Sequence, residues 1–68
     1  MNLQKQIYDY CGENKEVVLG DIMTAFLAYT YSGNNTQSIR NAIGSLCKKG
    51  LLVVNNGYYT AKEEVIYG

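Results

Sequence analysis

Apolar side chains recur at helical spacing in the second half of the chain, and this is the clearest pattern in the sequence. Ile39, Ile43 and Leu46 follow the i, i+4, i+7 spacing of an amphipathic helix. At about 100° per residue these side chains share one face with Ala42. The opposite face is polar or lacks a side chain, and it consists of Gln37, Asn41, Gly44, Ser45 and Lys48. The pattern predicts a helix over residues 36–49.

The residues at both ends of this predicted helix support the same boundaries. Asn35 suits the N-cap, because its side-chain oxygen can accept a hydrogen bond from an early helical N–H. Lys48 and Lys49 fall in the last turn, where the helix dipole favours positive charge. Gly50 suits the left-handed conformation that commonly follows a helix.

A β-hairpin is predicted directly after this helix, over residues 51–61. Its first strand is aliphatic, Leu51 to Val54, and its second strand begins with Tyr58 and Tyr59. Asn56-Gly57 tolerates the positive φ angles of a type I′ turn, the tightest common link between antiparallel strands.

The first half of the chain predicts two further helices. Leu3, Ile7, Tyr10 and Cys11 share a helical face, which indicates a helix over residues 2–11. Gly12 is the expected stop of this helix.

The second of these helices is expected over residues 21–29, with Asp21 as its cap or in its first turn. Its apolar face contains Phe26, the single phenylalanine and the expected centre of the core. Val17-Val18 is too short for a helix and could add a third strand to the hairpin. Residues 30–34 form a connection longer than a tight helix-turn-helix turn, and the tail 62–68 is left unassigned.

The 68 residues are expected to form a single domain with a marginal core. The sequence has no run of about 18 apolar residues, which is the length that a membrane-spanning helix needs. It also has no signal-peptide pattern at its start. We therefore expect a cytoplasmic protein without a membrane partner, in the host cytoplasm if the source is a virus.

Cys11 and Cys47 are the only cysteines, and the chain contains no histidine. Two cysteines without metal-ligand spacing do not indicate a zinc site, so we expect neither a metal nor a cofactor. The two thiols could both be free and buried, or they could form a disulfide between two helices.

The net charge of zero argues against a nucleic-acid-binding protein, but the distribution of the charges is uneven. Between Tyr31 and Lys62 the charged residues are Arg40, Lys48 and Lys49 together with Lys62 itself, and there is no acid. All six acidic residues lie elsewhere. A domain polarised in this way could present a basic face to phosphates.

The element order, together with SIRNAIGSLCKKGLL followed by GYY, resembles the winged helix-turn-helix family of small transcription regulators. The resemblance covers residues 3–61 and extends to small phage, plasmid or archaeal-virus proteins. It implies an α+β fold with three helices and a small antiparallel hairpin, the wing, over residues 51–61. It also implies that the third helix is the recognition helix.

By this resemblance, residues 36–45 enter the major groove of double-stranded DNA. Gln37, Ser38, Arg40 and Asn41 would face the bases, since Arg can pair with guanine and Asn or Gln with adenine. Phosphate or sugar contacts are expected from Thr36, Ser38, Lys48, Asn55 and Asn56. Unlike many DNA binders of the family, the chain has a single arginine and an uncharged wing tip.

These features predict a sequence-specific DNA-binding regulator that acts as a dimer, and no enzyme is expected because the chain has no catalytic motif. The alternative is a winged helix that binds protein, such as a viral inhibitor or adaptor of a host complex. The zero net charge, the uncharged wing and seven tyrosines favour that alternative, because tyrosine is enriched at protein interfaces.

Overall fold

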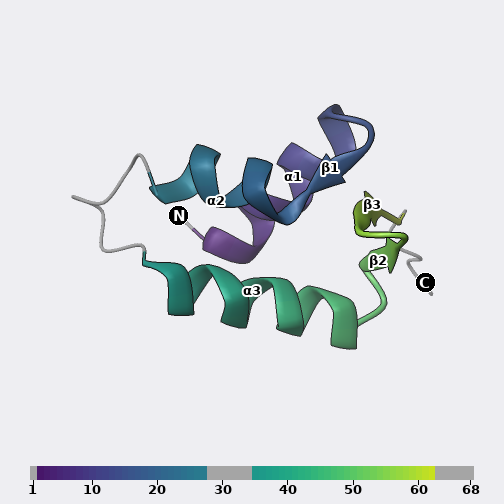
Figure 1. Cartoon of the computed structure of the whole chain (residues 1–68). Coiled ribbons are helices and arrows are strands. Elements are labelled where there is room, and N and C mark those ends of the chain that lie inside the picture. Colours follow the sequence, from purple (N-terminus) through teal and green to yellow (C-terminus); the bar gives the residue numbers. More distant parts are fainter. Residues whose placement is uncertain (1, 28–34, 63–68) are drawn as a thin grey trace.

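The computed structural model describes residues 2–27 and 35–62. Within them, three helices and three antiparallel strands follow one another in the order α1 (Leu3–Glu13), β1 (Val17–Val18), α2 (Leu19–Leu27), α3 (Thr36–Lys48), β2 (Leu52–Asn55) and β3 (Tyr58–Ala61). Helix α3 runs along one side of the molecule, and α1 and α2 lie on the opposite side. The hairpin lies beyond the C-terminal end of α3 (Figure 1). The predicted α+β class is confirmed.

Helix α3 begins at Thr36, directly after the predicted N-cap Asn35. The Asn35 side chain accepts a hydrogen bond from the Ser38 N–H at 2.8 Å, and the Ser38 hydroxyl accepts one from the Asn35 N–H at 2.9 Å. This capping box satisfies two N–H groups that the first turn leaves without helical partners. At the other end, Gly50 has a φ of +79°, as predicted, and the Leu51 N–H returns to the Leu46 carbonyl at 2.9 Å.

Two glycines of this region should respond to alanine in opposite directions. We expect Gly50→Ala to destabilise the fold by about 1 kcal/mol, because its positive φ strains any side chain. Gly44→Ala should stabilise it by up to about 1 kcal/mol, since a Cβ there meets nothing within 4 Å and alanine favours the helix. Urea unfolding of the two variants measures both effects, and shifts of the same sign would contradict this assignment.

Helix α1 is longer than predicted, and Gly12 does not stop it. The helix continues to Glu13, and Asn14 follows as the C-cap. The backbone N–H and the side-chain amide of Asn14 both donate to the Tyr10 carbonyl, at 3.1 and 2.9 Å. The helix therefore ends where a side chain satisfies its terminal carbonyl rather than where a glycine first permits an end.

Helix α2 starts at Leu19, two residues before the predicted start, and follows β1 without a loop. Asp21 lies in its first turn, and its carboxylate accepts a hydrogen bond from the Val18 N–H at 3.4 Å. The predicted last two residues of this helix lie outside the described residues, as do the whole connection 30–34 and the tail beyond Lys62.

The hairpin and the third strand form as predicted. The strand order is β1-β3-β2, so β3 lies in the middle, with Tyr59 opposite Val17 on one side and Val54 on the other. Asn56 and Gly57 have φ angles of +52° and +82°, the signs that a type I′ turn requires. The Tyr8 hydroxyl of α1 donates to the Lys62 carbonyl, which ties the end of the hairpin to the helices.

Isoleucine, rather than phenylalanine, occupies the centre of the core. Ile7, Ile22 and Ile39 come from the three helices and have no exposed surface. Phe26 retains 8% exposure and packs edge-to-face on Tyr10, with ring centroids 5.8 Å apart. The prediction that Phe26 is the centre is therefore wrong, because the last turn of α2 places this ring at the margin of the core. None of the described helices has the length and apolar character needed to cross a membrane.

Candidate nucleic-acid interface

The exposed side of α3 carries a continuous polar stripe. Gln37, Asn41, Gly44 and Lys48 lie four, three and four residues apart, so they follow one line along the helix. All four are exposed, and Arg40 is exposed beside them. The buried residues of the same helix face α1 and α2, so the stripe points away from both. The structure thus brings together four of the predicted DNA contacts: Gln37, Arg40, Asn41 and Lys48.

Two residues of the stripe are directly bonded to each other. The Gln37 side-chain Nε2 donates to the Asn41 Oδ1 at 2.8 Å. Amides at i and i+4 on a helix are close enough to bond, so the spacing alone could have indicated this contact. The bond restricts the rotamers of both side chains at the surface.

Ser38 and Thr36 have different places in the structure. Ser38 is half-buried, and its hydroxyl donates to the Asn35 carbonyl at 2.9 Å in addition to accepting from the Asn35 N–H. Its hydrogen is therefore used within the cap, which gives Ser38 a role in fixing the start of α3. Thr36 is exposed as the first residue of the helix.

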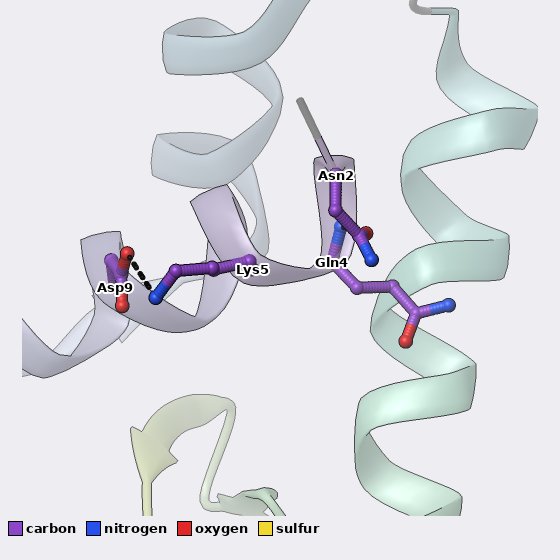
Figure 2. Close-up of polar contacts among 4 residues, drawn as sticks. All are labelled: Asn2, Gln4, Lys5 and Asp9. Carbon is purple, nitrogen blue, oxygen red and sulfur yellow. Dashed lines mark hydrogen bonds and ion pairs between the residues drawn. The ribbon is translucent and has the colours of Figure 1, made fainter.

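The two lysines at the end of α3 have different surroundings. Lys48 is exposed at the end of the stripe, whereas the Lys49 ammonium donates to the Gln4 side-chain oxygen of α1 at 3.0 Å. Gln4 extends from α1 toward α3, next to the cap that Asn2 provides (Figure 2). Sequence reasoning missed this contact, because nothing in the sequence places residues 4 and 49 side by side.

Figure 2 also shows the ion pair between Lys5 and Asp9, with nitrogen and oxygen 3.4 Å apart. It is the only ion pair among residues 2–27 and 35–62, and the Lys5 side chain is 74% exposed. An exposed pair of this kind contributes little to stability. The basic groups of α3 are thus not neutralised by acids within the described part of the chain.

The predicted wing contacts Asn55 and Asn56 are exposed at the tip of the hairpin, on a different element from the α3 stripe. The same hairpin holds the exposed large hydrophobic side chains of the described residues, Val53, Val54 and Tyr58. The hairpin strands carry no charge, so the tip offers amides and apolar surface rather than cations.

The described acids all lie outside α3 and the hairpin, whereas basic side chains occur in both parts of the fold. Residues 35–62 contain four basic side chains and no acid. The four described acids belong to α1, α2 and the segment between them, and two of these, Asp9 and Glu13, line a groove of about 480 Å³ between α1 and α2. The α3 surface is therefore the side of the molecule that favours an anionic partner.

Both cysteines are free thiols, Cys11 buried and Cys47 half-buried. Burial, and to a smaller extent the charge of Cys47, raises the pKa of Cys11 from 9.0 to about 11. The native state therefore retains the Cys11 proton at a pH where the unfolded chain would lose it.

This pKa predicts a pH-dependent loss of stability. The pKa of Cys11 is higher in the folded state than in the unfolded chain. The protonated thiol therefore contributes its full share of stability below about pH 9, and this contribution is lost as the pH rises to about 11. The free energy of unfolding should fall by up to about 3 kcal/mol across that window. Urea unfolding at a series of pH values measures this loss, with Cys11→Ala as the control that lacks the thiol. Equal pH slopes for the two chains would contradict the prediction.

Comparisons with known protein families, with curated proteins and with solved structures give no match. What the α3 surface can bind follows from its own groups, which are two linked amides, a guanidinium and an ammonium. Amides and guanidinium groups bond to base edges, and ammonium groups bond to phosphates.

Proposed function

We propose that this chain is a sequence-specific double-stranded DNA-binding protein of the winged helix-turn-helix type, and that it acts as a dimeric transcriptional regulator. The observation that carries the proposal is the exposed stripe of α3, where Arg40 lies beside the bonded Gln37 and Asn41. The surrounding segment of four basic residues without an acid supports it.

The order of the elements supports the winged-helix part of the proposal. A short strand precedes the second helix and pairs with the hairpin that follows the third, which gives a three-stranded sheet beside three helices. In this arrangement α3 acts as the recognition helix and the β2–β3 hairpin acts as the wing.

DNA recognition would divide between the two ends of α3. Its N-terminal half enters the major groove, where the Arg40 guanidinium donates to O6 and N7 of a guanine. Lys48, at the other end of the stripe, bonds to a phosphate, and Thr36 with the wing asparagines adds neutral phosphate contacts. Ser38 contributes indirectly by holding the first turn in place.

A dimer is proposed because one copy carries little charge. The three cations of and next to α3, Arg40, Lys48 and Lys49, can neutralise at most about three phosphates, which gives a salt slope of only about −3, and two copies would steepen it to about −5. Two copies on one duplex would also bind half-sites about one helical turn apart.

Selection of bound sequences from a random duplex library tests this function. The expected result is a motif with two similar half-sites, each containing a guanine that is lost when Arg40 is replaced. Recovery of no motif would overturn the proposal.

A protein-binding winged helix is the second candidate, favoured by the exposed Val53, Val54 and Tyr58 of the uncharged hairpin. Apolar and tyrosine side chains of this kind are common at protein interfaces. Failure to bind heparin or random duplex at low salt would favour this candidate over DNA binding.

A further inference from the structure

The bond between Gln37 and Asn41 changes what these side chains can offer a ligand. Each amide alone has two N–H donors and one oxygen acceptor, and a free amide can rotate to present either. In the structure the Gln37 Nε2 donates to the Asn41 Oδ1 at 2.8 Å, and both residues are exposed on the stripe.

In the bonded pair the Gln37 oxygen and the Asn41 amino group take no part in the mutual bond, and the Gln37 amino group keeps its second N–H. The Gln37 Oε1 remains free as an acceptor, and the Asn41 Nδ2 remains free as a donor. The result is the same if both amides are turned over, because the donating amide always leaves its oxygen free and the accepting amide always leaves its amino group free. The pair therefore presents an acceptor and a donor on adjacent turns of α3.

Only one base matches a donor and an acceptor placed side by side. In the major groove adenine presents the N7 acceptor beside the N6 amino donor, whereas guanine presents two acceptors, N7 and O6. The two amino groups could donate to N7 and O6 of a guanine, but the Gln37 oxygen would then have no hydrogen to accept, whereas adenine supplies one from N6. Cytosine offers the N4 donor, and thymine offers the O4 acceptor and a methyl group.

We propose that Gln37 and Asn41 act as a single unit that reads one adenine in the major groove, a proposal that rests on the DNA-binding function above. One amide donates to N7 and the other accepts from the N6 amino group, while their mutual bond fixes the spacing. Arg40 carries donors only and so suits guanine. The helix would thus have two readers with different base preferences.

A double-mutant cycle on the selected site distinguishes a unit from two independent side chains. Library selection is run with the wild type, Gln37→Ala, Asn41→Ala and the double variant. Each half-site of the wild-type motif should contain one A·T pair that all three variants no longer require. Affinity for the wild-type site should fall about 5- to 150-fold in each single variant, and no further in the double variant.

Base analogues test the same contact from the DNA side. Replacing that adenine with 7-deazaadenine removes the N7 acceptor, and replacing it with purine removes the N6 donor. Each analogue should weaken the wild type and leave the double variant unchanged. Thr24→Ala, which alters an exposed polar residue of α2, is the control and should retain the full motif.

Three outcomes would overturn the paired reading while leaving DNA binding intact. These are losses that add in the double variant, a motif whose adenines are unaffected by either substitution, and guanine as the base lost with the pair. If the wild type selects no motif at all, the DNA-binding function itself fails, and the paired reading fails with it.

Discussion

Replacing Ile22 with alanine should leave the domain largely unfolded. Ile22 has no exposed surface and belongs to α2, in one core cluster with the buried residues of the other two helices. Truncating a buried isoleucine costs about 2–5 kcal/mol, through lost burial and the cavity that remains. A core of this size contributes about 3–5 kcal/mol of net stability, so the loss is comparable with the total.

Circular dichroism during urea unfolding measures this loss. The matched control is Val54→Ala, which removes an aliphatic side chain that is 52% exposed on the hairpin. We expect that control to change the free energy of unfolding by less than about 0.5 kcal/mol. A cooperative transition for Ile22→Ala with a loss below about 1 kcal/mol would contradict the core described above.

Replacing Arg40 with alanine should remove the preference of the protein for the guanine in its target site. A paired Arg–guanine contact is worth about 1–3 kcal/mol of discrimination, which corresponds to about 5- to 150-fold in affinity. The expected loss is confined to sites that contain the guanine, while affinity for random duplex should fall only slightly. Mobility-shift titrations with the selected site and with a guanine-substituted site measure both quantities.

Lys15→Ala is the control for charge in this experiment, because it removes one positive charge from an exposed residue between α1 and β1. Lys15→Ala should leave unchanged the ratio of the affinities for the selected site and the guanine-substituted site. If Arg40→Ala lowered affinity for both sites equally, Arg40 would be a phosphate contact rather than a base contact.

Local features of the chain were predictable because they depend on neighbouring residues. Asn35 marks the start of α3 and Gly50 marks its end, through hydrogen bonds and φ angles within a few residues of each position. Asn56-Gly57 likewise sets the hairpin turn through its own φ angles. The addition of Val17–Val18 to the hairpin as a third strand was also anticipated, whereas its pairing with β3 rather than β2 was not.

Features that depend on packing were not predictable. The centre of the core was decided by isoleucines of three separate helices rather than by the largest apolar ring. The end of α1 is a local feature that was also missed, because Asn14 rather than Gly12 ends the helix by bonding to the Tyr10 carbonyl. The contact between Lys49 and Gln4 joins residues 45 positions apart, and no local pattern indicates it.

The candidate site, too, was predictable only in part. The angular pattern predicted which side of α3 is exposed, and Gln37, Arg40 and Asn41 are exposed there. Ser38 was expected to contact DNA, but a serine at the third helical position can serve either a partner or the cap. In the structure Ser38 is part of the helix cap, because its hydroxyl accepts a hydrogen bond from the Asn35 N–H and donates one to the Asn35 carbonyl.

The most direct test of DNA binding is a salt titration of affinity for random-sequence duplex, followed by fluorescence anisotropy. We expect clear binding at about 50 mM salt and a logarithmic slope between about −3 and −5, so that affinity falls at least about 60-fold by about 200 mM. Absence of binding at the lowest salt, with the protein folded, would contradict the proposed function.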